Sequence, residues 1–219
     1  MRSQEAKEKR MQEIEEAAYA LLSETGYKAT SMLAVAKRSK ASNETLYRWY
    51  GNKQGLFRRM VERNATAASG TIEKALEARR PIGDLLEDLG PLLLRLVLGE
   101  RSVALNRAAA GDIHDSASLG AMIAAGGRAK IQDLLAEAFS REKDVPLPPR
   151  EAASLYLDLL VGDAQLKRVI GAADYPGETW IEDRAAWTKR MFRLLIGQAE
   201  GKQRAQEKNG RPKPPAPAS

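Results

Sequence analysis

Hydrophobic residues recur along most of the chain at helical spacing, three or four positions apart. The first such stretch covers about residues 4–24, and its apolar positions are Met11, Ile14, Ala18, Leu21 and Leu22. Segments in which apolar and polar residues alternate, as they do in β-strands, are nearly absent. The pattern therefore predicts an all-α protein with about nine helices.

Short polar segments divide the first eighty residues into four predicted helices. Gly26 is suited to end the first helix in a left-handed C-cap, and Thr30 occupies the expected N-cap position of the second. Ser39-Lys40-Ala41 forms a tight turn, and Asn52 is a further N-cap candidate. The helices that follow the first are expected at about residues 31–38, 42–49 and 53–80.

The rest of the chain predicts a larger helical body. Pro81-Ile82-Gly83-Asp84 interrupts the pattern, and five helices are expected after it, at about residues 85–98, 102–110, 117–139, 150–170 and 178–198. Gly126-Gly127 divides or kinks the third of these. We therefore predict an N-terminal domain at 1–52, a connecting helix at 53–80, a C-terminal domain at 81–200 and a disordered, basic, proline-rich tail at 201–219.

Composition excludes several classes of protein. The 219 residues allow a small head and a larger body, and 43% of them are hydrophobic. There is no cysteine, and no run of about 18 apolar residues that would predict a membrane span. The charged N-terminus lacks the apolar segment of a signal peptide. We expect a cytoplasmic protein without a cofactor or a metal site.

Charge is distributed unevenly. The balance of Lys and Arg over Asp and Glu is +5 in residues 1–60, −3 in residues 61–200 and +4 in residues 201–219. A basic end on a mildly acidic body is typical of a protein that contacts a polyanion through one segment. A basic surface that is merely solvated is the alternative.

Two short helices joined by the turn at 39–41 form a helix-turn-helix, whose second helix is suited to a DNA major groove. Leu46 and Tyr50 are expected to anchor that helix to the core. Glu44, Thr45, Tyr47 and Arg48 lie on the opposite side, and Thr, Tyr and Arg donate to phosphates and base edges. Thr30 and Ser31 open the first of the two helices with unpaired N–H groups that suit a phosphate, and Lys53 could hold the DNA backbone.

Residues 11–60 resemble the N-terminal domain of the TetR/AcrR family of transcriptional regulators. The matching motifs are Ile14-Glu-Glu-Ala17-Ala18, Gly26-Tyr27-Lys28-Ala29-Thr30 and Thr45-Leu46-Tyr47, followed by Tyr50 and Lys53. The resemblance implies double-stranded operator DNA as a partner. It also implies DNA-contacting positions at Thr30, Ser42, Asn43, Thr45, Tyr47, Arg48, Trp49 and Lys53.

Two residues depart from the family pattern. Glu44 stands where the family commonly has a small residue, and a carboxylate would repel phosphates. It could orient Arg48 four positions later, accept a hydrogen bond from a cytosine, or simply be tolerated at the groove edge. Trp49 stands where the family often has His, and its ring could pack on the core while its N–H reaches the DNA backbone.

The body resembles the AefR-like C-terminal domain, in segments 121–139 and 148–171. This resemblance implies a homodimer that binds a small-molecule effector. Two apolar stripes are candidates for the dimer interface, unless the core of one chain uses them. Their residues are Leu155, Leu159, Gly162, Leu166, Ile170, Trp180, Trp187, Met191 and Leu194.

Candidate effector-binding residues come from the middle helices: Leu92, Leu96, Asn106, His114, Met122, Ile123 and Tyr156. His114, the single histidine, could serve a ligand or be an ordinary surface histidine. With no cysteine and one histidine, a nucleophile–base pair has few candidates, and Asp112-x-His114-Asp115 lacks further metal ligands. We therefore expect no enzymatic activity.

These observations together predict a ligand-responsive homodimeric repressor that binds a palindromic operator. A non-specific architectural DNA-binding protein is the first alternative, because it would explain the basic ends of the chain. A helical enzyme that acts on a small molecule is the second alternative.

Overall fold

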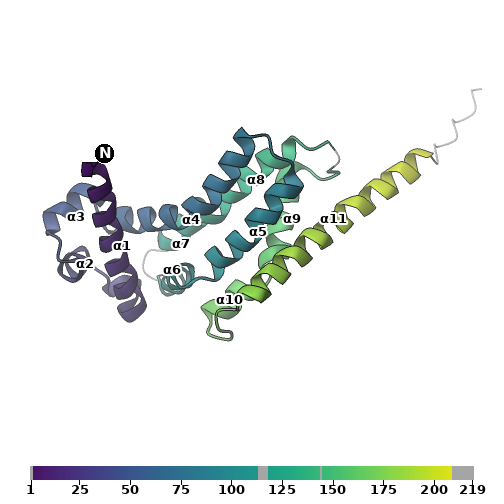
Figure 1. The fold of residues 1–219 in the computed structure, drawn as a ribbon. Coiled ribbons are helices and arrows are strands. Elements are labelled where there is room, and N and C mark those ends of the chain that lie inside the picture. Colours follow the sequence, from purple (N-terminus) through teal and green to yellow (C-terminus); the bar gives the residue numbers. More distant parts are fainter. Residues whose placement is uncertain (1, 113–117, 144, 209–219) are drawn as a thin grey trace, which may run out of the picture.

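The computed structural model describes residues 2–112, 118–143 and 145–208. Within these ranges the chain forms eleven α-helices and one π-helical segment, and no strand. Figure 1 shows a small helical head beside a larger helical body. The prediction of an all-α protein with a head and a body is confirmed.

The head consists of α1 (Arg2–Ala29), α2 (Met32–Ser39) and α3 (Asn43–Tyr50). Gly26 breaks the regular geometry near the end of α1 with φ 75°, a conformation that favours glycine. The apolar stripe predicted for the first helix faces inward, with Ile14 and Ala18 fully buried. Phe57 of the following helix completes the core, and Tyr27 packs edge-on against its ring at 4.8 Å.

α4 (Lys53–Glu77) leads from the head into the body. Asn52 caps its N-terminus as predicted, because its side chain accepts a hydrogen bond from the Gly55 N–H at 2.8 Å. A Cβ atom at Gly55 would lie 1.9 Å from the Tyr50 carbonyl oxygen. The backbone of α4 therefore closely approaches the end of α3, which fixes one helix relative to the other.

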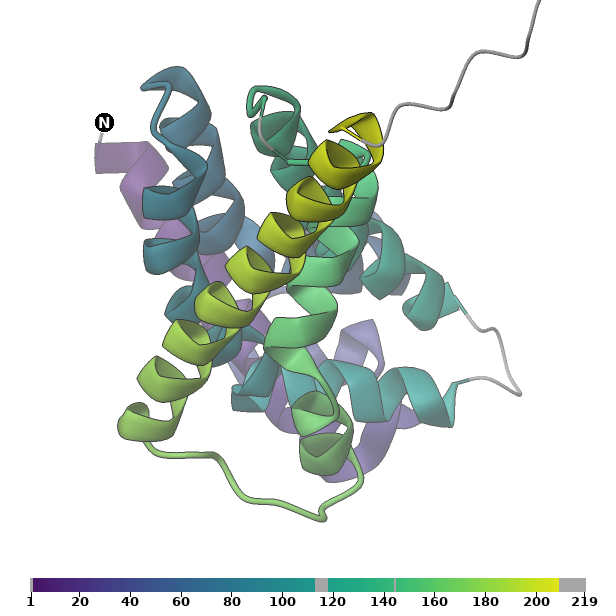
Figure 2. The same cartoon turned by 90° about the vertical axis from the view of Figure 1, so that its right-hand side faces the viewer.

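The body is built from the remaining helices around a second apolar core. Tyr156 and Phe139 lie at the centre of that core, and both pack against the ring of Phe192. Figure 2 shows the last helix crossing the front of the bundle. The elements are α5 (Ile82–Leu98), α6 (Glu100–Gly111), α7 (Ser118–Ile123), a π-helical segment (Ala124–Ala129), α8 (Lys130–Ser140), α9 (Pro149–Val161), α10 (Ala164–Val169) and α11 (Glu178–Lys208).

The interruption predicted at Gly126-Gly127 is confirmed, and two other boundaries differ from the prediction. The segment around Gly126 is a π-helical turn between α7 and α8, so the stretch at 117–139 forms three elements. Gly162, with φ 51°, ends α9, so the stretch at 150–170 is two helices. α11 continues through Gly201 to Lys208, because residues 202–208 are mostly strong helix formers. Residues 209–219 of the predicted tail lie outside the described residues.

The head is packed directly against the body. Leu105 and Ala108 of α6, with Leu119 of α7, belong to the same buried cluster as the head core. Arg101 of α6 also forms an ion pair with Glu16 of α1 and lies over the ring of Tyr19. A displacement of α6 would therefore disturb its contacts with α1.

Candidate nucleic-acid interface and body cavity

Side-chain caps set the geometry of the helix-turn-helix. Ser31 accepts a hydrogen bond from the Ala34 N–H, and Ser42 accepts one from the Thr45 N–H, both at 3.1 Å. Lys40 ends α2 in a left-handed conformation with φ 53°. The turn predicted at 39–41 is confirmed, whereas the cap of α2 is Ser31 and not Thr30.

α3 exposes the face that the helical wheel predicts. Leu46 and Tyr50 are buried in the head core, and Tyr47 is 50% exposed. Arg48 is exposed and forms no ion pair with any residue of the described chain, Glu44 included. The hypothesis that Glu44 orients Arg48 therefore has no support in this conformation. An unpaired guanidinium and a phenol on one exposed helix form a surface suited to a nucleic acid.

The ten predicted contact residues divide into two groups. Seven are exposed or half-exposed around the turn: Ser31, Ser42, Asn43, Glu44, Thr45, Tyr47 and Arg48. Trp49 is half-buried against the head core, and Thr30 is buried with its hydroxyl donating to the Gly26 carbonyl at 2.8 Å. In this conformation Thr30 stabilises the kinked end of α1.

Lys53 also has a partner inside the protein. Its ammonium donates to the carbonyl oxygens of Tyr27 and Lys28 and lies 4.0 Å from the centre of the Tyr27 ring. Partial burial lowers the pKa of the Lys53 ammonium. This lysine thus links the start of α4 to the end of α1, at the edge of the helix-turn-helix.

A buried ion pair, which the sequence did not predict, joins α1 to α4. The carboxylate of Glu15 is almost fully buried and lies 2.5 Å from the Arg63 guanidinium, which also pairs with Glu8. The Tyr50 hydroxyl, at the end of α3, donates to the same carboxylate at 3.5 Å. Glu15 lies four positions after Met11, on the apolar stripe of the first helix. A charged residue among these inward-facing positions was the sequence signal from which a buried ion pair could have been predicted.

Arg63→Met is expected to lower the free energy of unfolding by about 3 kcal/mol near pH 7, because it leaves the Glu15 carboxylate buried without its partner. Burial already raises the pKa of Glu15 above its ordinary value of 4.5, against the effect of Arg63. A carboxyl with a raised pKa destabilises the folded protein once the pH exceeds the unfolded value. The loss of unfolding free energy in Arg63→Met should therefore become smaller as the pH is lowered from 7 toward about 5. Urea unfolding at both pH values would measure this difference.

Arg101→Met is the matched control, because its partner Glu16 is half-exposed. It should cost less than about 1 kcal/mol, with little dependence on pH. The double variant Glu15→Leu/Arg63→Met should recover much of the stability. A loss for Arg63→Met that is equal at both pH values would contradict the assignment of the effect to Glu15.

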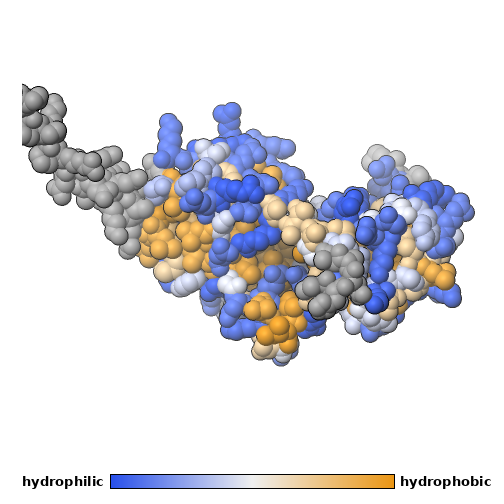
Figure 3. All heavy atoms as spheres, turned by 180° about the vertical axis from the view of Figure 1, so that it is seen from behind, coloured by the Kyte–Doolittle hydropathy of each residue, from blue (hydrophilic) through white to orange (hydrophobic). Residues whose placement is uncertain are grey.

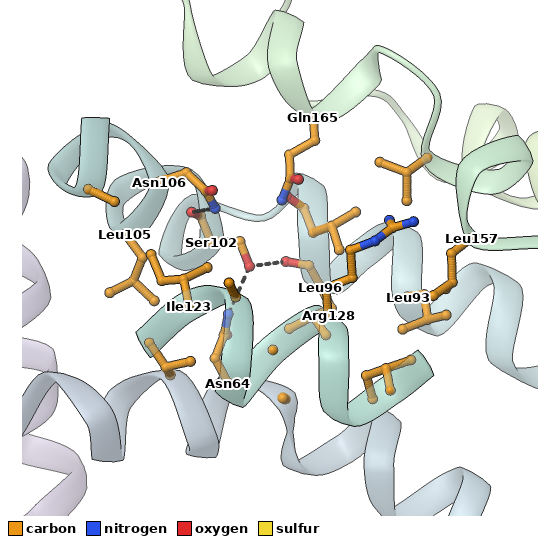
Figure 4. Close-up of a pocket in the computed structure, with 18 of the residues that line it drawn as sticks. Asn64, Leu93, Leu96, Ser102, Leu105, Asn106, Ile123, Arg128, Leu157 and Gln165 are labelled. Atoms are coloured by element: carbon orange, nitrogen blue, oxygen red, sulfur yellow. Dashed lines mark hydrogen bonds between the residues drawn. The ribbon is translucent and has the colours of Figure 1, made fainter. Parts of the chain in front are cut away.

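The body contains a cavity of about 360 Å³ between α4, α5, α6, the π-helical segment and α10 (Figure 4). Most of its lining is apolar, and five polar side chains interrupt that lining: Asn64, Ser102, Asn106, Arg128 and Gln165. Cavities of roughly 300–1,000 Å³ with few polar groups are typical of small-molecule sites. The geometry therefore suits a compact, largely apolar ligand.

Only part of the predicted effector-binding set lines this cavity. Leu96, Asn106 and Ile123 do so. Leu92 and Met122 instead pack against the body core and the head core, respectively. Tyr156 is buried in the body core and donates to the Leu86 carbonyl at 3.2 Å. His114 lies outside the described residues. Hydrophobic periodicity identifies inward-facing positions but does not distinguish a cavity wall from a packed core.

Comparison with known proteins assigns the head. Residues 14–60 match the family described as "Bacterial regulatory proteins, tetR family". The head is therefore a TetR-family regulatory domain. Members of this family are not enzymes, so the enzyme alternative is set aside. No curated protein matches the chain.

Solved structures, two of them described as TetR regulators, share the fold over 85% of the chain. A regulator from Mesorhizobium loti MAFF303099 is 21% identical with a TM-score of 0.67, covering 85% of this chain and 96% of that one. One from Agrobacterium tumefaciens is 25% identical with a TM-score of 0.63, covering 85% and 93%. The flavonoid-responsive regulator FrrA is 26% identical with a TM-score of 0.61, covering 85% and 96%.

The body of the protein carries exposed apolar side chains. Figure 3 shows hydrophobic surface on the body and a mostly hydrophilic head. Of the predicted dimer residues, the most exposed are Leu166, Ile170, Trp180, Trp187 and Leu194, whereas Leu155, Leu159 and Met191 are half-buried. Gly162 does not lie on a continuous helical stripe, because its positive φ ends α9.

Arg184 explains the conformation around Gly162. Its guanidinium donates to the Leu159 and Leu160 carbonyls at the end of α9, at 2.6 and 3.0 Å. A Cβ atom at Gly162 would lie 2.9 Å from that guanidinium. The glycine thus makes room for the arginine that caps the helix, instead of permitting a close approach between helices.

No helix of the described residues is both long and apolar enough to cross a membrane. The described ranges hold no group of three or more acidic or histidine side chains placed to bind a metal ion. Of Asp112-x-His114-Asp115, only Asp112 is described, and its carboxylate is buried and accepts from the Leu119 N–H at 3.5 Å.

Proposed function

We propose that this TetR-family regulator is a homodimeric repressor, which binds a palindromic operator and is released from it by a small molecule. The observation that carries the proposal is the course of α4. This helix starts directly after the recognition helix α3, and three residues of its middle line the body cavity: Val61, Asn64 and Ala65. One rigid element thus contacts both candidate sites.

On the DNA side, the head (1–52) is proposed to place α3 in the major groove. Tyr47 and Arg48 would contact bases or phosphates, with Ser42, Asn43, Glu44 and Thr45 beside them. The N-terminus of α2 at Ser31 would hold a phosphate. Trp49, Thr30 and Lys53 would contribute at the edge, where Thr30 and Lys53 would first have to leave their present hydrogen bonds. Two heads about one helical turn apart, roughly 34 Å, would match a palindrome.

On the body side (81–200), the proposed dimer uses the exposed apolar residues of α10 and α11. The resemblance of segments 121–139 and 148–171 to the AefR-like C-terminal domain supports this assignment. The effector would occupy the cavity and favour a spacing of the heads that no longer fits DNA. The description of FrrA as flavonoid-responsive supports a response to a small molecule in a protein of similar fold.

Selection of bound DNA from a random-sequence pool, at about physiological salt, tests the proposal. We expect recovery of one palindromic motif, and a molar mass in solution equal to two chains. A motif without two-fold symmetry would count against the dimeric repressor.

The basic ends of the chain favour one alternative, non-specific binding to DNA. That alternative requires similar affinity for all sequences and a steep dependence on salt. Measuring affinity for the selected motif and for a scrambled duplex, across a range of salt concentrations, separates the two functions.

A further inference from the structure

The hydrogen bonds of the cavity wall restrict the chemistry of the effector, if the protein has the proposed function. Asn64, on α4, donates to the Ser102 hydroxyl of α6 at 2.8 Å, and that hydroxyl donates to the Leu96 carbonyl at 2.6 Å. Figure 4 shows Asn64, Ser102 and Asn106 close together on one side of the cavity. This chain of hydrogen bonds is the polar link between α4 and α6 within the cavity.

The orientation of the three amide side chains follows from their partners. Asn106 donates to the Ser102 carbonyl at 2.8 Å, and Gln165 donates to the Val97 carbonyl at 3.1 Å. Carbonyl oxygens only accept, so the amide nitrogens must face them. Asn64 is fixed in the same way, because the single Ser102 hydrogen goes to Leu96. Each amide therefore keeps an oxygen, and one further N–H, for a ligand.

The charges around the cavity disfavour an ionic ligand. No carboxylate lines it, so a cationic ligand would have no counterion there. The single charged lining residue, Arg128, already pairs with Asp158 at 2.6 Å, and both side chains are about half-exposed. A carboxylate placed beside Asn64 could accept from the remaining amide N–H groups, but it would also lie against amide oxygens that cannot donate to it. Its charge would have no free cationic partner in the cavity, and burying an unpaired charge is costly.

We propose that the effector is a compact, uncharged molecule whose hydroxyl group binds Asn64 and Ser102 and so replaces the hydrogen bond between α4 and α6. A hydroxyl both donates and accepts, so it can lie between the two side chains: it accepts from the Asn64 N–H that now bonds Ser102, and it donates to the Ser102 oxygen, whose own hydrogen stays on the Leu96 carbonyl. Once that bond is replaced, α6, which packs on α1, is no longer tied to α4 at this point. The exchange of one hydrogen bond thus links ligand binding to the two helices that hold the head.

Three matched sets of probes, built on benzene, biphenyl and stilbene, test the ligand class. Each set holds a dihydroxy, a dimethoxy and a carboxylate member, and thermal shift and calorimetry on the DNA-free protein report binding. We expect a dihydroxy member of at least one set to bind at least about tenfold more tightly than its dimethoxy and carboxylate counterparts. Preference for the carboxylates, or binding of no dihydroxy member, would overturn the proposal.

The variant Asn64→Leu tests whether Asn64 binds the hydroxyl group of the probe. This substitution keeps the side chain's approximate size and should weaken binding of the best dihydroxy probe about tenfold, without changing affinity for its dimethoxy counterpart. Gln132→Leu is the matched control, because Gln132 also joins two helices through a serine, Ser154, but does not line the cavity. Equal losses for both probes in Asn64→Leu would indicate a change of cavity shape and overturn the role of the hydrogen bond.

The coupling between probe binding and DNA binding is measured separately. It is the factor by which a saturating probe lowers the affinity of the protein for the selected operator. We expect Asn64→Leu to reduce this factor at least about threefold at saturation, and Gln132→Leu to preserve it. Because probe binding is measured without DNA, recovery of no operator motif would contradict the proposed repressor function alone. A dihydroxy probe that binds but leaves operator affinity unchanged would overturn the proposed link between α4 and α6.

Discussion

Replacing Tyr47 and Arg48 together with alanine should reduce operator affinity at least about 100-fold, while the protein stays folded and dimeric. Both side chains are exposed on α3, and removing them exposes no core, because Leu46 and Tyr50 anchor the helix from its other side. A good contact to a base edge contributes roughly 1–3 kcal/mol of binding free energy, so the loss of two such contacts corresponds to a loss of affinity of about 100-fold. Fluorescence anisotropy with the selected operator at fixed salt would measure it.

The single variants separate the contributions of the two residues. Arg48→Ala should also relax the preference at one position of the motif, whereas loss of a phosphate contact weakens all sequences equally. Arg80→Ala is a suitable control, because it removes an exposed arginine of the body, paired with Asp88, without touching the head. If Arg80→Ala weakened operator binding as much as Arg48→Ala, the recognition face would be misassigned.

Local sequence signals were sufficient for most of the head. Asn52 precedes its helix in the position where a short polar side chain caps, and Gly26 lies where a positive φ is needed. The anchors Leu46 and Tyr50 follow from helical periodicity alone. These features depend on residues within four positions of one another, which a single sequence records directly.

Features that depend on partners distant in the sequence could not be predicted. Lys53 contacts carbonyls at the end of α1, and Glu15 pairs with Arg63 on another helix. Gly162 resembles a packing glycine in a helix until the position of Arg184, which caps the end of α9, is known. The cavity wall could not be predicted for the same reason, because Asn64 and Ser102 come together only when α4 and α6 pack against each other.

Trp187→Glu combined with Leu194→Glu should convert the proposed dimer into a monomer and remove most of its operator affinity. The two residues lie seven positions apart on one side of α11, and both are exposed in the single chain, at 37% and 53%. Two-fold symmetry would place four carboxylates in one apolar interface, where they would be desolvated without partners. We expect the dimer dissociation constant to rise at least about 1,000-fold.

Sedimentation velocity would give the oligomeric state, and circular dichroism would show whether the helices persist. Lys143→Glu changes charge in the same direction on the exposed turn after α8 and should leave the dimer intact. A monomer with an intact head would still bind a half-site, but without the second head its affinity for the palindrome should fall to that of the half-site. A variant that stays dimeric would place the interface elsewhere on the body, whereas a monomer with full operator affinity would contradict recognition by two heads.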